Sequence, residues 1–141
     1  MLRTRAIIAG ALAAGTLTVG GMPAATGGGA QEQSRAPLPG ERTAIAAATR
    51  GVVPLQVRPK VRVAGIRVST RSRHWAKASI VPLPAYRATL EGAGVVLVRS
   101  AVTNRWTVVD LGTDAVGCRI APISVLRDLG MAASCPGRDR L

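Results

Sequence analysis

The stretch from Gly94 to Leu111, GVVLVRSAVTNRWTVVDL, decides the fold of this chain. It contains two valine-rich runs, Gly94–Ser100 and Arg105–Leu111, and the short segment Ala101–Asn104 separates them. Two such runs joined by a turn predict an antiparallel β-hairpin. We expect Trp106 in the second run to be buried, because a chain without phenylalanine has few other large side chains for a core.

Two further strands are predicted upstream of this hairpin. From Val57 onward valines alternate with cations in VRPKVRV, which is the two-residue period of a strand with one buried face. The alternation changes phase around Gly65, so the sequence predicts a β-bulge there, with a tight turn as the alternative. A second strand is predicted for Trp75–Val81, and Pro82 ends it. The sheet therefore has three or four antiparallel strands.

Helical signals lie on both sides of the strands. Glu41–Arg50, ERTAIAAATR, contains good helix formers, begins with an acid and is followed by Gly51. A second helix is predicted for Pro122–Gly130, because proline suits a first turn and glycine a helix end. The fold class is therefore α+β: a short N-terminal helix packed on a three- to four-stranded antiparallel sheet, with a C-terminal helix.

The first 30 residues read as a secretory signal peptide. Arg3 and Arg5 precede an uncharged apolar run that small residues follow, and this run is too short and too rich in glycine for a membrane span. Cleavage is expected after Ala30 or slightly earlier. Residues 31–40 are predicted to be a flexible tether, because they are polar and contain Pro37, Pro39 and Gly40. Residues 41–141 then form a single domain, and the protein is expected to be secreted.

Export determines how the two cysteines are interpreted. Outside the cytosol a thiol pair usually persists as a disulfide, so Cys118 and Cys135 are predicted to be bridged. A zinc site is a poor alternative, because His74 is the only histidine and is distant in sequence. The two cysteines flank the predicted C-terminal helix, so the bridge would tether it at both ends.

Three segments resemble small, largely uncharacterised exported proteins of actinobacteria. They are HWAKASIVP (His74–Pro82), GVVLVRSAVTNRWTVVDLGT (Gly94–Thr113) and VGCRIAPISVLRDLGM (Val116–Met131), the last followed by Cys135. The resemblance spans roughly residues 61–135. It implies export and the disulfide, and it implies no enzymatic activity.

The sequence offers little for catalysis, and we expect a protein that is not an enzyme, with no cofactor and no metal. His74 is interpreted as a turn residue, and no nucleophile or phosphate-loop motif accompanies it. Asp110 and Asp114 are considered as paired carboxylates, but a strand end and a glycine-containing turn explain them more simply. Trp75 is either a core residue or part of a binding platform for sugars or bases.

The strongest functional signal is charge. The chain has 19 lysines and arginines against seven acids, a net charge of +12. If the region from Val57 is a strand, one of its faces carries a row of cations about 7 Å apart. The predicted anion-binding residues are Arg58, Lys60, Arg62, Arg67, Arg71 and Arg73. The alternative is that these cations only keep an edge strand soluble.

These observations predict a secreted, monomeric or weakly associating interaction protein of the cell envelope or the extracellular space. The expected partner is an anionic polymer of the cell wall, an anionic lipid surface, or nucleic acid bound without regard to its sequence. The alternative function is a secreted peptidase inhibitor, for which the predicted loop Pro82–Gly92 would face an extracellular protease.

Overall fold

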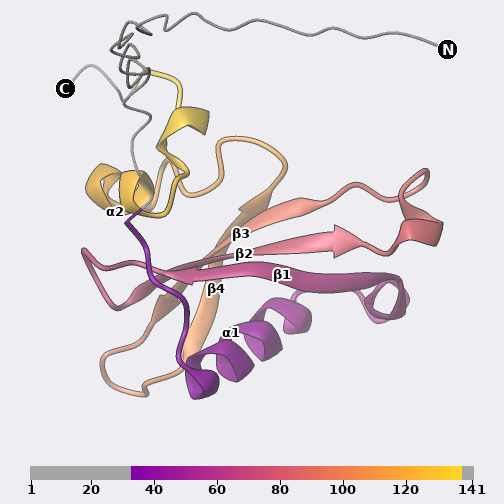
Figure 1. Ribbon diagram of the computed structural model, residues 1–141, viewed down its shortest axis with the longest axis horizontal. Helices are drawn as coiled ribbons and strands as arrows, with labels where there is room; N and C mark the ends of the chain where they lie inside the picture. Colours follow the sequence, from indigo (N-terminus) through magenta and orange to yellow (C-terminus); the bar gives the residue numbers. More distant parts are fainter. Residues whose placement is uncertain (1–32, 138–141) are drawn as a thin grey trace, which may run out of the picture.

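The computed structural model describes residues 33–137, and the predicted signal peptide lies outside them. The sheet has four strands. Figure 1 shows a helix on each side of it. The helices and strands, in chain order, are α1 (Pro39–Gly51), η1 (Arg58–Lys60), β1 (Val61–Val68), β2 (Trp75–Pro82), η2 (Pro84–Tyr86), β3 (Ala93–Arg99), β4 (Trp106–Gly112), α2 (Ile123–Asp128) and η3 (Ala132–Ser134). The fold is α+β, as predicted.

The sheet is an antiparallel meander in the order β1-β2-β3-β4. The predicted bulge in β1 is confirmed, because the register with β2 shifts between Ala64 and Arg67 and Gly65 has a φ of +60°. A second bulge, which the sequence did not predict, shifts the register of β3 with β4 after Val96. Bulges of this kind bend a strand and increase its twist.

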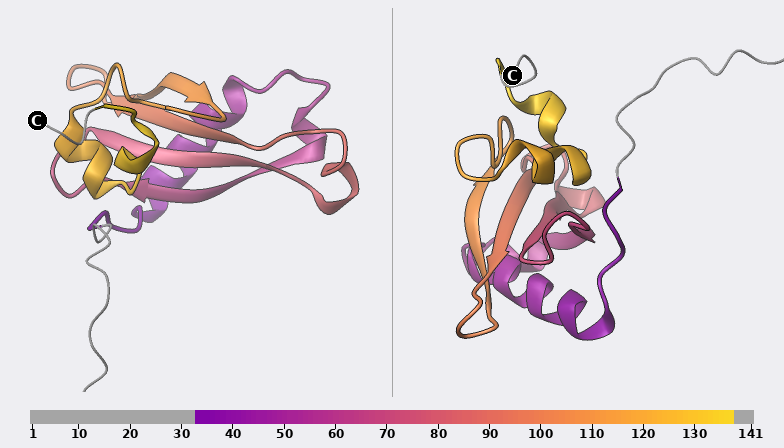
Figure 2. Two further views of the ribbon diagram at one scale, coloured as in Figure 1. Left: turned by 90° about the horizontal axis from the view of Figure 1, so that it is seen from above. Right: turned by 90° about the vertical axis from the view of Figure 1, so that its left-hand side faces the viewer.

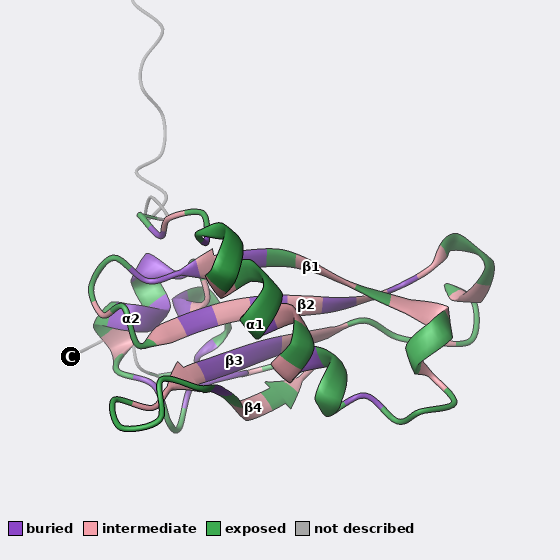
Figure 3. Cartoon of the chain, turned by 90° about the horizontal axis from the view of Figure 1, so that it is seen from below, coloured by how far each residue is buried: buried purple, intermediate pink, exposed green. Residues whose placement is uncertain are grey.

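The sheet is covered on both faces, by α1 on one and by the C-terminal segment with α2 on the other (Figure 2). Ile45 of α1 packs in the larger core, together with Val95, Leu97 and Trp106, which confirms that this tryptophan is buried. On the opposite face a smaller cluster includes Leu126 and the two cysteines, and Trp75 packs against it. Figure 3 shows the exposed outer side of α1 and the exposed loops at both ends of the sheet.

The predicted disulfide is present. Cys118 and Cys135 are bonded, with their Cα atoms 5.4 Å apart, and the bridge closes the segment that contains α2. This helix is shorter than predicted: Pro122 is its N-cap, and Gly130, with a φ of +69°, follows its end. No helix within residues 33–137 is long and apolar enough to cross a membrane.

The predicted start of the first strand is wrong. The predicted strand does not start at Val57, because Arg58–Lys60 is a turn of 3-10 helix around Pro59 and β1 starts at Val61. Proline lacks the N–H that a strand ladder needs. The continuous row of strand cations therefore does not exist.

The segment predicted as a flexible tether is part of the fold where it is described. Arg35 and Val68 exchange two backbone hydrogen bonds, of 2.9 and 3.0 Å, at the edge of β1. Ser34 is 4 % exposed, and its N–H donates to the carbonyl of Asp128, 3.1 Å away. The helix that follows begins at Pro39 rather than at Glu41. Ser34 and Arg35 thus connect β1 to α2.

Candidate anion-binding site

The six predicted anion-binding residues lie in three places: two before β1, two within it and two in the turn that follows it. The group before β1 is partly engaged in intramolecular contacts. Arg58 donates from Nε to the carbonyl of Val53 (2.9 Å) and from Nη2 to that of Gly51 (3.2 Å), so it binds the C-terminal end of α1. The ammonium of Lys60 lies 5.6 Å from the centre of the Tyr86 ring. Helix ends favour such cations, which gives Arg58 a structural role.

Two other predicted residues occupy β1 itself. Arg62 is exposed on the strand. Arg67 is half-buried and donates hydrogen bonds to the side chain and to the carbonyl of Ser34. Arg67 therefore fastens the N-terminal segment to the sheet, and its guanidinium is not available as a whole to an external anion.

The remaining two residues, Arg71 and Arg73, lie in the turn between β1 and β2. Both side chains are exposed, and neither guanidinium makes an ion pair or hydrogen bond with any residue of the described chain. Ser69 shapes the turn, because its Oγ accepts the N–H groups of Arg71 (3.1 Å) and Ser72 (3.2 Å). Serine favours turns through such contacts with its own backbone.

Asp128, at the end of α2, holds this turn in place. Its carboxylate accepts the Ser69 hydroxyl (2.6 Å), and the N–H (2.7 Å) and hydroxyl (2.9 Å) of Thr70. It also accepts the N–H of Arg71 at 3.3 Å. Burial raises the pKa of Asp128, but these hydrogen bonds outweigh burial and the pKa is lowered. The carboxylate is therefore ionised near neutral pH, and its acceptor capacity is used inside the protein.

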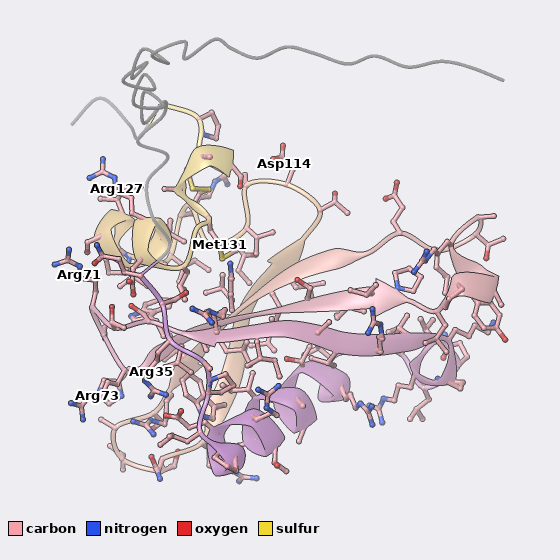
Figure 4. All side chains as sticks on the ribbon, viewed as in Figure 1. Arg35, Arg71, Arg73, Asp114, Arg127 and Met131 are labelled. Carbon is pink, nitrogen blue, oxygen red and sulfur yellow. A yellow bond between two sulfur atoms is a disulfide. The ribbon has the colours of Figure 1, made fainter. Side chains whose placement is uncertain are left out.

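The same contact brings a cation from α2 to the turn. Arg127 is exposed and directly precedes Asp128. Figure 4 shows Arg127 and Arg71 at one end of the molecule, with Arg73 further along the same end. We call these three residues, Arg71, Arg73 and Arg127, the basic end. Arg127 was not among the predicted anion-binding residues, because no sequence signal indicates that a helix 54 positions after Arg73 returns to this turn.

An open cavity of about 430 Å³ adjoins the basic end. Its lining residues are Arg35, Ala36, Leu38, Thr70 and Arg73. Arg35 is already neutralised by Glu41, whose two carboxylate oxygens accept from the guanidinium at 2.7 and 2.8 Å. The hydrogen bond from Arg35 holds the pKa of Glu41 down at about 2, against the opposing effect of burial. Arg73 is therefore the cation of this cavity that has no acidic partner among residues 33–137.

Cations exceed acids in the described part of the chain. Residues 33–137 carry fifteen lysines and arginines against five acids, a net charge of +10. Glu41 and Asp128, the acids near the basic end, are engaged as described above. Asp114 lies on a different loop in Figure 4, away from Arg71 and Arg73. The field at the basic end is therefore positive, with little compensation from acids.

The residues considered for catalysis have structural contacts. His74 is exposed, and its carbonyl accepts the N–H of Arg99 at 2.8 Å. Asp110 accepts the N–H of Gly117 (2.7 Å), and Asp114 accepts that of its neighbour Ala115 (2.8 Å). The two aspartates line one cavity of about 540 Å³. No cluster of three or more metal-binding side chains occurs within the described part of the chain.

Two other regions were predicted to be possible binding surfaces: Trp75 and the loop Pro82–Gly92. Trp75 is half-buried against the smaller cluster, so its role is at least partly that of a core residue. The loop Pro82–Gly92 is folded into tight turns, in which the carbonyl of Tyr86 accepts the N–H groups of Thr89 (3.0 Å) and Leu90 (2.9 Å). It is not an extended segment of the kind that pairs with the strand edge of a partner.

Comparison with known proteins adds no further assignment. No family model matches the chain, and neither the curated proteins nor the solved structures contain a significant match.

Proposed function

We propose that this protein is an exported, non-enzymatic binding domain that attaches to polyanions through its basic end. The observation that carries the proposal is the set of three exposed arginines, Arg71, Arg73 and Arg127, without an ion pair in the described chain. The signal-peptide pattern and the disulfide support export.

The arrangement favours binding by charge over recognition of a particular sequence. Arginine presents a planar set of donors that suits phosphate and sulfate oxygens. Asp128 fixes the backbone from which Arg71 projects, so less conformational entropy is lost on binding. By contrast, α2 has only six residues, too few for a recognition helix that would read a DNA groove.

Binding of the protein to polyanions should weaken with salt and should require the arginines of the basic end. The test is a titration of fluorescently labelled duplex DNA, with heparin as a second polyanion, over a series of salt concentrations. The parent protein should bind both, more weakly as salt increases, because counterions are released on binding. Arg71→Ser with Arg73→Ser should weaken binding about tenfold or more at low salt. The slope of log K against log salt should fall by about two, roughly one per arginine.

The control removes the same charge elsewhere. Arg62→Ser with Arg87→Ser replaces two exposed arginines outside the basic end. This variant should keep the parent's slope within about half a unit. If the two double variants lose affinity equally, binding reflects net charge alone and the basic end is not a site. Thermal unfolding of each variant shows whether the fold is retained.

A further inference from the structure

Two exposed aliphatic side chains lie at the same end of the molecule as the basic end. Val102 is 94 % exposed in the turn between β3 and β4, and Leu38, directly before α1, is 62 % exposed. Single exposed apolar residues are common on protein surfaces. These two differ because both lie at the end of the sheet that carries the proposed binding site.

Contacts within the protein place Leu38 and Val102 at this end. Leu38 and Arg73 line the same cavity. The N–H of Arg99 donates to the carbonyl of His74 at 2.8 Å, which joins the β1–β2 turn to the base of the β3–β4 turn. Figure 1 shows both turns at the same end of the sheet. One end of the molecule therefore carries arginines together with two exposed aliphatic side chains.

The turn that presents Val102 is held by its own hydrogen bonds. The Oγ of Ser100 accepts the N–H groups of Val102 (3.3 Å) and Thr103 (3.1 Å). The backbone of Ser100 accepts from Asn104 (2.9 Å) and donates to Arg105 (3.0 Å). Asn104 has a φ of +56°, a conformation that asparagine tolerates. The valine is thus displayed by an ordered turn, and the next cation in the chain, Arg105, is also exposed.

We propose that the anionic partner of the basic end is a phospholipid surface, with Val102 and Leu38 entering the boundary between head groups and acyl chains. This rests on the proposed function and names its partner. Arginines are attracted to anionic head groups, while exposed aliphatic groups gain from leaving water. A soluble polyanion offers the charge alone, and a lipid surface offers both the charge and the apolar phase.

Binding to lipid vesicles distinguishes a phospholipid surface from a soluble polyanion as the partner. The parent should sediment with vesicles of phosphatidylcholine containing about one third phosphatidylglycerol, and far less with phosphatidylcholine alone. Val102→Ser with Leu38→Ser should reduce partitioning into the anionic vesicles about tenfold, because the aliphatic carbons no longer enter the lipid. The same variant should bind heparin as the parent does.

A matched control replaces exposed aliphatic residues elsewhere. Val52 and Leu55, between α1 and η1, are 42 % and 73 % exposed at the other end of β1. Val52→Ser with Leu55→Ser should partition like the parent. Equal partitioning of the Val102/Leu38 variant and the parent overturns the lipid inference while the heparin result still supports polyanion binding. If Arg71→Ser with Arg73→Ser changes neither heparin nor vesicle binding, the proposed function itself is wrong.

Discussion

Glu41 is the residue at which the N-terminal segment and α1 are joined. Its carboxylate accepts two hydrogen bonds from Arg35 and one from the N–H of Leu38 at 3.0 Å, and it lies 3.9 Å from the guanidinium of Arg99. An acid in a helical first turn that caps a preceding N–H stabilises the start of the helix. One carboxylate thus stabilises α1 and fixes the residues that enter it.

This carboxylate predicts loss of stability in acid. The pKa of Glu41 is about 2 in the folded protein, against 4.5 ordinarily. The ionised Glu41 carboxylate makes its full contribution to the free energy of unfolding above about pH 5. This contribution is lost as pH falls toward 2, because the carboxyl group binds a proton at higher pH in the unfolded chain than in the folded protein. Glu41→Gln should lower the free energy of unfolding by about 1–2 kcal/mol at pH 7, a discounted figure since Arg35 is partly exposed. Urea unfolding at pH 7 and pH 3 measures this, and an equal loss at both pH values contradicts it.

Gly117 permits close contact between the C-terminal segment and the sheet. Its φ is +81°, and a Cβ there would lie 2.9 Å from Val96 Cγ2 and 3.0 Å from Leu126 Cδ2. Gly117→Ala should therefore destabilise the protein by about 2–4 kcal/mol, through backbone strain and overpacking. Gly40→Ala, in a helix with no atom within 4 Å of the added carbon, serves as the control and should cost nothing. Thermal unfolding compares the two, and equal melting temperatures would contradict the prediction.

At the scale of elements, α2 depends on its attachments. With six residues it is too short to be stable alone. The disulfide closes the segment around it, Leu126 and Leu129 are fully buried, and Asp128 binds the β1–β2 turn. The helix in turn positions the arginine-bearing turn, so the disulfide and the basic end are connected through Asp128.

Removal of the disulfide should therefore affect the basic end. Cys118→Ser with Cys135→Ser is expected to lose about 3 kcal/mol of stability, in the chain-entropy account of cross-links. Amide hydrogen exchange should accelerate first in α2 and at Thr70 and Arg71, whose N–H groups Asp128 accepts, while β2 and β3 stay protected. Uniform acceleration across the sheet would show instead that the segment unfolds only with the whole domain.

At the scale of the whole molecule, a single sheet is shielded by two unequal layers. The larger core lies under α1, and the smaller cluster lies under the disulfide-closed segment. The central strand β3 is buried on both faces, as Val95, Val96 and Leu97 are all fully buried. β1 is an edge strand of the sheet, and the pairing of Arg35 with Val68 covers part of its free edge.

The sequence by itself determined the elements with local signals. Valine periodicity and the turn before Arg105 predicted the hairpin, Gly65 marked the bulge, and the two cysteines predicted the bridge. The hairpin and the bulge depend on residues that are close in the chain. The bridge could be predicted because two cysteines allow only one pairing. The second bulge, at which Val109 of β4 has no partner in β3, has no glycine to mark it, so it was not predicted.

Only the tertiary structure decided which cations are available. Arg58 and Arg67 resemble Arg71 and Arg73 in the sequence, yet the former two are engaged by backbone carbonyls and by Ser34. Arg127 joins the turn through the contact of Asp128, across 57 to 59 positions of chain. Charge is read from residue type, whereas its availability depends on hydrogen bonds between distant segments, which no local pattern encodes.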